Sequence, residues 1–326
     1  MMTDWNGKRV LVTGAEGFIG STLVQELLRA GATVRAFAHY KPYGTNGYLA
    51  EFLDDVELVP GDVRDPGRVA EAVSGCDTVF HLAALIGIPY SYQAPDSYVE
   101  TNVAGTHHVA AACLRHDARL VHTSTSEVYG TARSVPISEE HPLQPQSPYP
   151  ASKIGADMLA LSYWHSFGLP VTVARPFNTY GPRQSARAVI PAILAQLHGG
   201  VREIRIGSTS PTRDFTYVTD TVAGFLALAG APATCGRVVN IGTGNEISIG
   251  GLIDLLAEIT GTEATAREDP DRIRPAGSEV ERLVCDNRLI GELTGWSTRV
   301  SLREGLRHTS DWLKANRDAD AHRYQV

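Results

Sequence analysis

The sequence predicts an α/β protein: a doubly wound parallel sheet with a second, smaller α/β lobe. Two observations lead to this prediction. Over roughly the first half of the 326 residues, short apolar runs alternate with amphipathic stretches, as they do when helices join parallel strands. After about residue 176 the alternation becomes irregular, which indicates a separate lobe.

Each expected strand is a short run of β-branched, aromatic and other apolar residues, closed by glycine or polar residues. In the first half these runs are KRVLVTG, TVRAFA, VELVPGD, DTVFHLAA, ARLVHTST and PVTVARPF, and later ones are REIRIG, RDFTYV and RVVNIG. Apolar residues at helical spacing predict helices over 18–30, 66–74, 97–116, 149–167, 187–199, 219–230, 248–260 and 301–315.

The domain boundary is expected near residue 176. Residues 1–176 form the first domain, rejoined by about 216–245, and the smaller lobe takes 177–215 and 246–326. Ligands of such sheets bind at the carboxyl ends of the strands, so the residues that follow each strand are the candidates for a site.

Composition excludes several classes of protein. A net charge of −7 leaves no basic surface for nucleic acid, and no apolar run reaches the length of a membrane span. The N-terminus lacks an apolar signal core, so we expect a cytoplasmic protein. The four cysteines are far apart without CxxC spacing, and His107 and His108 have no neighbouring ligands, so we expect neither disulfides nor a metal site.

Three glycines at spacings of three stand where the first strand meets the first helix, in VTGAEGFIG. Glycine lets the backbone approach a pyrophosphate, and a helix N-terminus offers free N–H groups. In the first strand-helix-strand unit this motif predicts a Rossmann-like dinucleotide-binding domain, with GDVRD near the adenine. The predicted cofactor residues here are Gly14, Gly17, Phe18, Ile19, Gly20, Asp62 and Val63.

The second strand lacks the acidic residue that usually binds the ribose 2′-hydroxyl of NAD. It ends in RAFAHYK, where His39 and Lys41 could accept a 2′-phosphate instead. The choice between NAD and NADP therefore stays open.

A tyrosine between two prolines is followed four residues later by a lysine, in SPYPASK. Pro148 and Pro150 suit the first turn of a helix, so Tyr149 and Lys153 share one helix face. We expect the ammonium to lower the pKa of the phenol, which could then remove a proton from a sugar hydroxyl.

The segment HTSTSEVYG follows the fifth strand and concentrates polar side chains at its carboxyl end. We expect Thr125 to bond the substrate oxygen that Tyr149 deprotonates, and Glu127 to act as a second base. Ser126 lies between them.

Together with TGAEGFIG, GDVRD, HLAA, TNVAGT, RPFNTYGPR and RDFTYVTD in the same order, these motifs resemble the extended short-chain dehydrogenase/reductase superfamily of sugar-nucleotide epimerases, dehydratases and decarboxylases. The resemblance covers nearly the whole chain. It implies a bound NAD that takes a hydride from C4 of a nucleotide-linked sugar, and a smaller lobe that binds the substrate. It further implies cofactor contacts from Leu82, Ala83, Ala84, Asn102, Tyr149 and Lys153, and substrate contacts from Asn178, Arg187, Arg213 and Arg274.

The triplet Thr125-Ser126-Glu127 leaves the reaction open. The familiar dehydratases carry aspartate in the middle position of the triplet. The triplet found here also resembles that of nucleotide-sugar glucuronate decarboxylases. Longer runs such as LAALIGIPYSYQ and GPRQSARAVIPAI resemble 4,6-dehydratases of nucleotide-linked N-acetylglucosamine of the legionaminic-acid type. We therefore expect 4,6-dehydration of a UDP-N-acetylglucosamine-like sugar, with a C4-epimerase, a UDP-glucuronate decarboxylase or a non-catalytic dinucleotide sensor as alternatives.

The resemblance also implies a homodimer. In this superfamily the helices expected at 97–116 and 149–167 commonly form a four-helix interface.

Overall fold

The computed structural model describes residues 4–40, 46–272 and 275–316. Lys41 and Arg274, two residues considered for phosphate binding, lie outside the described residues.

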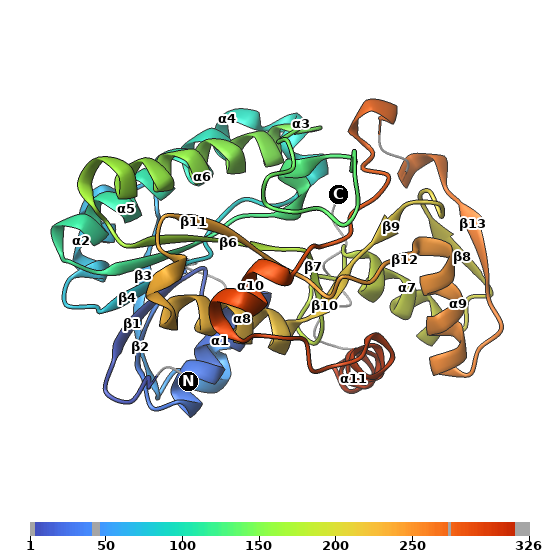
Figure 1. The fold of residues 1–326 in the computed structure, drawn as a ribbon. Coiled ribbons are helices and arrows are strands. Elements are labelled where there is room, and N and C mark those ends of the chain that lie inside the picture. Colours follow the sequence, from blue (N-terminus) through green and yellow to red (C-terminus); the bar gives the residue numbers. More distant parts are fainter. Residues whose placement is uncertain (1–3, 41–45, 273–274, 317–326) are drawn as a thin grey trace.

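A seven-stranded parallel sheet forms the larger part of the molecule (Figure 1). Its strand order is β3-β2-β1-β4-β5-β6-β11, and every neighbouring pair runs parallel. The strands are β1 (Arg9–Thr13), β2 (Thr33–His39), β3 (Val56–Gly61), β4 (Thr78–His81), β5 (Arg119–Thr123), β6 (Val171–Pro176) and β11 (Arg237–Ile241). The order runs outward from β1 in both directions, which confirms the doubly wound fold class.

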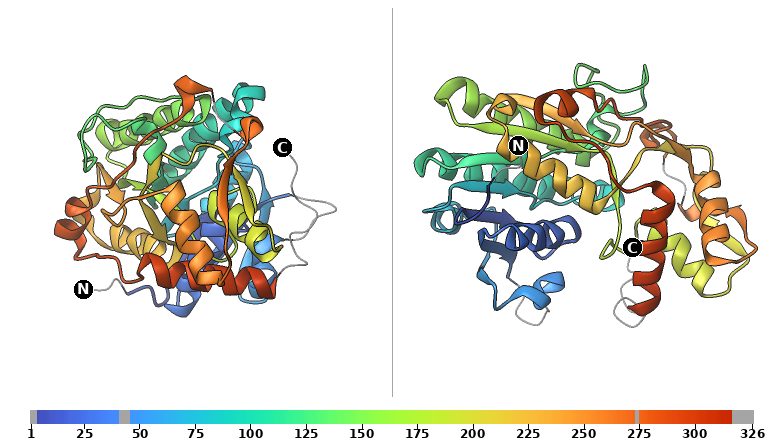
Figure 2. Two further views of the ribbon diagram at one scale, coloured as in Figure 1. Left: turned by 90° about the vertical axis from the view of Figure 1, so that its right-hand side faces the viewer. Right: turned by 60° about the horizontal axis from the view of Figure 1, so that its bottom comes forward.

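Helices cover both faces of this sheet. One face packs against α2 (Pro66–Val73), α5 (Gly105–Arg115) and α6 (Pro148–Phe167). The other face, which comes forward in the right-hand view of Figure 2, packs against α1 (Phe18–Arg29), α8 (Val218–Gly230) and α10 (Arg288–Thr294). The return of β11 and α8 places residues from beyond 215 in the same core as the first strand.

The predicted helix over 97–116 is divided. A short helix α4 (Pro95–Tyr98) leads into a π-helical turn η2 (Val99–Ala104) and then into α5. The widened turn contains Asn102, whose side chain bonds the backbone of Leu85 and the hydroxyl of Ser152. Such tertiary contacts favour a π-turn over a continuous α-helix, and the sequence period does not reveal them.

The smaller lobe lies beyond the carboxyl ends of the central strands, on the right of Figure 1. It contains three short two-stranded sheets: β7 (Asn178–Tyr180) with β10 (Phe215–Tyr217), β9 (Thr212–Arg213) with β12 (Ile247–Ser248), and β8 (Glu203–Ile206) with β13 (Thr265–Glu268). Its helices α7 (Val189–His198), α9 (Ile249–Thr260) and α11 (Leu302–Ala315) enclose a separate apolar core. None of the helices in the described ranges is long and apolar enough to cross a membrane.

Candidate active site

The glycine-rich turn after β1 is packed too tightly for side chains. Gly14 has a φ of +67°, and a Cβ placed there would lie 2.9 Å from the backbone nitrogen of Ala83. A Cβ on Gly20 would lie 2.1 Å from the carbonyl oxygen of Gly14. Gly17 precedes α1 without a side-chain cap, so the N-terminus of the helix is left for an anionic ligand. Phe18 and Ile19 form its first turn.

The segment after β4 is fastened to this turn. The hydroxyl of Thr13 accepts hydrogen bonds from the N–H groups of Leu82 and Ala83, both at 3.1 Å. Ala84 continues the segment and is half-buried. The side-chain oxygen of Asn102 accepts the N–H of Leu85, and its NH2 group donates to the Leu85 carbonyl. We infer that Asn102 fixes the backbone of the segment after β4, and thereby the shape of the cofactor site.

Asp62 and Val63 follow β3, as predicted. The Asp62 carboxylate is engaged by Arg64, 2.7 Å away, and this hydrogen bond lowers the pKa of Asp62. Val63 is buried beneath α5, where a Cβ on Gly105 would approach to 2.8 Å of its side chain.

Both the shape and the polar groups of this edge fit a dinucleotide. The glycine turn forms a cradle that side chains would fill, and the hydroxyl of Thr123, at the end of β5, is buried without a hydrogen-bond partner in the described structure. A buried hydroxyl without a partner is costly, so a bound ligand is the expected partner. Within the described ranges, no three His, Cys, Asp or Glu side chains gather as they would around a metal.

Tyr149 lies at the start of α6, beside Thr125. Pro148 occupies the first turn, and Ser147 before it is extended, as the sequence predicts. The phenol is 8% exposed and lies within hydrogen-bonding reach of Thr125, and its ring meets that of Tyr98 edge-on with centroids 6.3 Å apart. The structure therefore brings Tyr149 and Thr125 together.

The prediction that the pKa of Tyr149 is lowered is wrong for this structure, which contains the protein chain alone. Burial raises the pKa of the phenol well above its ordinary value, the hydrogen bond from Thr125 opposes this, and the Glu127 carboxylate adds to it. Lys153 is also buried, and burial lowers the pKa of its ammonium to about 8 while Asp157 raises it. The sequence shows the i to i+4 spacing but not that both groups are desolvated.

Behind Lys153 lies a buried polar network that the sequence analysis missed. Asp157, one turn further along α6, accepts hydrogen bonds from His122 (3.1 Å), Ser124 (2.5 Å) and Arg175 (2.8 Å). Burial by itself would raise the pKa of Asp157, but the hydrogen bond from His122 and the charges of Arg175, His122 and Lys153 lower it to about 2. Burial, followed by the charge of Lys153, lowers the pKa of His122 to about 4. Asp157 is therefore the anion of this cluster.

The last two residues of the triplet after β5 begin a single 3-10 turn, η3 (Ser126–Tyr129). Thr125 precedes the turn, and its hydroxyl accepts the N–H of Glu127 at 3.3 Å. Ser126 is 2% exposed, whereas Thr125 and Glu127 are half-buried. Thr125 and Glu127 are thus more accessible to a ligand than Ser126.

The predicted substrate residues are spread over the smaller lobe and its approach. Asn178 begins β7 and its side-chain oxygen is buried without a partner in the described part of the chain. Asn178 pairs with Phe215 of β10, and Arg213 lies in β9 just before that strand. Arg213 is 7% exposed and lies 3.2 Å from Glu279. Arg187 is exposed, and its charge acts on Tyr98.

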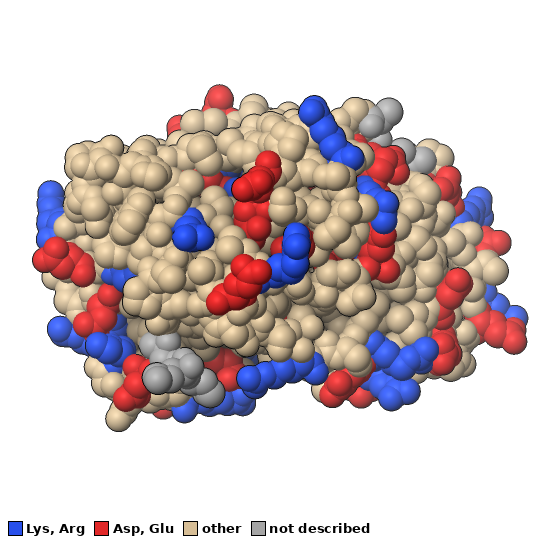
Figure 3. Space-filling view, viewed as in Figure 1, with Lys and Arg blue, Asp and Glu red and all other residues tan. Residues whose placement is uncertain are grey.

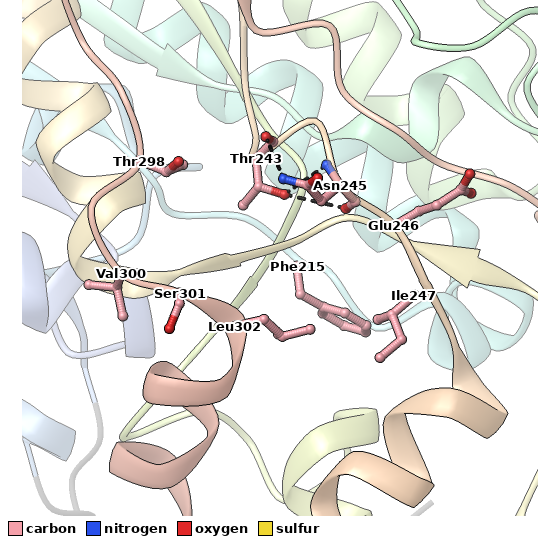
Figure 4. A pocket seen from close by; sticks show the side chains of 9 residues that line it. All are labelled: Phe215, Thr243, Asn245, Glu246, Ile247, Thr298, Val300, Ser301 and Leu302. Atoms are coloured by element: carbon pink, nitrogen blue, oxygen red, sulfur yellow. Dashed lines mark hydrogen bonds between the residues drawn. The ribbon is translucent and has the colours of Figure 1, made fainter.

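A hollow of about 300 Å³ lies next to this region, since its lining residues Phe215 and Ile247 pair with Asn178 and Arg213 (Figure 4). Figure 4 shows an apolar floor with polar side chains of the segment after β11 above it. Buried Asp214 fixes that segment by accepting hydrogen bonds from Thr243 and Gly244. The residues that line the hollow are Phe215, Thr243, Asn245, Glu246, Ile247, Thr298, Val300, Ser301 and Leu302, and none of them was predicted as a site residue.

Comparison with known proteins places these features in a family. The family described as GDP-mannose 4,6 dehydratase matches residues 11–309. A dTDP-glucose 4,6-dehydratase of Actinoplanes sp. (strain ATCC 31044 / CBS 674.73 / SE50/110) is 36% identical over 95% of this chain and 98% of its own. A UDP-glucose 4-epimerase of Mycolicibacterium smegmatis (strain ATCC 700084 / mc(2)155) is also 36% identical, over 94% and 98% of the two chains.

Two solved structures show the same fold with ligands. The dTDP-glucose 4,6-dehydratase DesIV from Streptomyces venezuelae, with NAD and TYD bound, has a TM-score of 0.87 at 31% identity and covers 95% of this chain and 98% of its own. UDP-glucuronic acid 4-epimerase from Bacillus cereus, with UDP-glucuronic acid and NAD, has a TM-score of 0.86 at 30% identity, over 94% and 99%. These matches confirm the predicted family and NAD as its cofactor.

Proposed function

Since this chain belongs to the GDP-mannose 4,6-dehydratase family of NAD-dependent sugar-nucleotide enzymes, we propose that it catalyses 4,6-dehydration of a UDP-N-acetylglucosamine-like substrate. The product would be the 4-keto-6-deoxy sugar. The observation that carries this proposal is the cluster of Tyr149, Thr125 and Glu127 at the carboxyl end of β5, with Lys153 buried behind it.

The first step assigned to this cluster is oxidation at C4. Thr125 holds the O4 hydroxyl, and the Tyr149 phenolate accepts the O4 proton. When bound, NAD supplies the oxidant for C4 and later returns the same hydride to C6. The glycine turn, the segment after β4 and Lys153 would hold the cofactor. Burial raises the pKa of Tyr149, so the phenolate would need the positive charges of Lys153, protonated below about pH 8, and of bound NAD to stabilise it.

The second step assigned to the site is loss of water across C5 and C6. The C4 ketone makes the C5 proton acidic, so the Glu127 carboxylate can remove it. The same group, now protonated, delivers that proton to the departing C6 hydroxyl, and water leaves. Glu127 thereby acts as both base and acid, and Ser126, buried beside it, is assigned no proton transfer. The hydride returned to C6 would be matched by a proton that C5 takes up from Glu127 after this group regains one from solvent. Tyr149 releases the O4 proton, so the net change is the loss of one water.

A neutral C6 group is supported by the apolar wall beside Tyr149. Leu85, Ile88 and Tyr98 pack together with Tyr149 in one cluster. Apolar side chains cannot solvate a carboxylate, so a charged C6 group would lose much hydration free energy beside them. A neutral hydroxymethyl group loses less.

A second candidate is an enzyme that acts on UDP-glucuronate. Arg187 is the observation in its favour, because its charge acts on Tyr98 and could pair with a C6 carboxylate. Relatives include a UDP-N-acetyl-alpha-D-glucosaminuronate decarboxylase at 31% identity and the UDP-glucuronic acid 4-epimerase. For either candidate we assign the diphosphate to Asn178, Arg213 and Arg274.

We further propose a homodimer formed through α5 and α6. The charged residues of α6, Lys153 and Asp157, are buried, while its outer face exposes Met158 (46%) and Phe167 (61%). Figure 3 shows few charged side chains over this helix. Exposed apolar side chains on a helix whose Lys and Asp residues face inward favour a contact with a partner. Met158→Glu should yield a monomer by light scattering, whereas Val201→Glu in the smaller lobe should not.

Product mass distinguishes the candidate reactions. The purified protein is incubated with UDP-N-acetylglucosamine and, separately, with UDP-glucuronate. Loss of one water from the first supports dehydration, and loss of carbon dioxide from the second supports decarboxylation. An unchanged mass with a new sugar in either reaction indicates an epimerase. Tyr149→Phe should retain NAD and lose product formation in every case.

A further inference from the structure

The carboxylate that is missing from the end of β2 is supplied by another segment. Strand β2 ends in Ala38 and His39, where a ribose-binding acid usually stands. Glu16, inside the glycine-rich turn, extends to the same place. Its Oε1 accepts the backbone N–H of His39 at 2.9 Å.

The other oxygen of this carboxylate has no protein partner. Oε2 of Glu16 is buried and makes no hydrogen bond within the described part of the chain. A buried charged oxygen without a donor is unfavourable, so the site is built for a donor that comes with a ligand.

The backbone of Glu16 is also held in place. Its carbonyl accepts the N–H of Tyr48 at 3.3 Å, and a Cβ on Gly47 would lie 2.6 Å from that carbonyl. The short helix η1 (Gly47–Phe52) therefore packs directly on residue 16. Fixed at its backbone and at Oε1, the side chain presents Oε2 in a preset position.

Among the described residues, which do not include Lys41, the charges near Glu16 do not favour a second phosphate. Asp62 lies 3.9 Å from the imidazole of His39 and is paired with Arg64. Arg183, which also reaches this side of the molecule, is paired with Glu51. No arginine or lysine in the described ranges forms an ion pair with Glu16. An arginine is the usual partner of a 2′-phosphate.

We propose that Glu16 determines the preference of this enzyme for NAD over NADP, with Oε1 fixed by the amide of His39 and Oε2 accepting a hydrogen bond from the adenosine ribose 2′-hydroxyl. The carboxylate takes the place of the acid normally found at the end of the second strand. Its charge repels a 2′-phosphate at the same position. The inference is independent of which sugar reaction the enzyme catalyses.

The test compares Glu16→Gln with wild type in two measurements that use no sugar substrate. The first is the NAD and NADP content released from the purified protein on denaturation. The second is the affinity for NADH and for NADPH, taken from the rise of the unfolding midpoint with cofactor concentration. Glutamine keeps the size of the side chain and an acceptor for the His39 amide but removes the charge.

We expect the ratio of the affinities for NADH and NADPH to fall about 10- to 100-fold in Glu16→Gln. This is the change in binding expected when one charge-assisted hydrogen bond is lost. Glu26→Gln is the matched control, because Glu26 lies in α1 and pairs only with Arg29 among the described ion pairs. It should leave the preference unchanged. An unchanged preference in Glu16→Gln, or an equal loss of affinity for both cofactors, would overturn the proposal.

A double variant tests whether a carboxylate at the end of β2 can replace that of Glu16. Glu16→Gln/His39→Asp places an acid at the end of β2, where the side chain of His39 is 58% exposed. Recovery of the NADH preference in the double variant supports the proposal. If the double variant folds and still lacks the preference, a carboxylate at this place is not what selects the cofactor.

Discussion

The carboxylate of Asp157 lies 2.8 Å from the guanidinium of Arg175, and both side chains are almost completely buried behind Lys153. Arg175 also donates a hydrogen bond to the hydroxyl of Tyr129 (2.8 Å), and this hydroxyl donates to the side-chain oxygen of Asn240 on β11. With His122 of β5, which also bonds Asp157, these contacts connect α6 to β5, β6 and β11.

Asp157→Asn should destabilise the fold strongly. It leaves the Arg175 charge buried without a counter-ion, which typically costs about 3–5 kcal/mol. Urea unfolding of the cofactor-bound protein measures the change in free energy. Glu258→Gln, which removes an exposed partner of Arg303, should leave the unfolding midpoint where it is. Equal stabilities of Asp157→Asn and wild type would show that the buried pair is not needed for the fold.

Lys153 should impose a pH dependence on stability. Its pKa falls from 10.5 in the unfolded chain to about 8 in the folded one, so between these values the unfolded chain binds more protons. The contribution of Lys153 to the unfolding free energy therefore rises as pH increases from about 8 to about 10.5. Below pH 8 both states are protonated and the contribution is constant.

Lys153→Met isolates this effect. The difference in unfolding free energy between wild type and Lys153→Met should shift in favour of wild type across that alkaline range, since methionine does not titrate. A difference that is flat from pH 7 to 10 would mean that the lysine is not desolvated as the structure shows.

Glu127→Gln separates the two steps of the proposed reaction. Oxidation at C4 should still occur, so the absorbance of reduced nicotinamide should rise on addition of substrate. Dehydration should slow by about 100-fold or more because the base is lost. Ser126→Ala is the matched variant and should stay within about tenfold of wild type. A greater loss in Ser126→Ala than in Glu127→Gln would reverse the roles assigned here.

Gly20→Ala should impair cofactor retention and stability. The added Cβ would lie 2.1 Å from the carbonyl oxygen of Gly14, so the turn must shift. At Gly17 the nearest contact of an added Cβ is 3.3 Å, and Gly17→Ala should have the smaller effect on the unfolding midpoint. Similar midpoints for the two variants would show that the turn is more adaptable than its packing suggests.

The fold class could be predicted because each strand and helix carries its own local pattern. The glycine turn, Tyr149 and Thr125 follow strands or begin helices, and the parallel sheet brings their positions to one edge. These are properties of short segments, which the sequence displays directly.

The missed features depend on contacts between distant segments. Glu16 meets the end of β2 only after folding, and the pairing of Asp157 with Arg175 spans two elements. The position of Asp157 one turn after Lys153 was the available signal, but spacing alone does not show what the side chain meets. The raised pKa of Tyr149 was missed for the same reason, since burial is a property of the whole fold.

The most direct test of the proposed reaction follows the hydrogen at C4. UDP-N-acetylglucosamine with deuterium at C4 is converted by the purified enzyme, and the position of the label in the product is read by nuclear magnetic resonance. Dehydration through a C4 ketone predicts a product lighter by one water, with the deuterium in the new methyl group at C6. Deuterium that remains at C4 of a product of unchanged mass would contradict 4,6-dehydration and show that the enzyme is an epimerase.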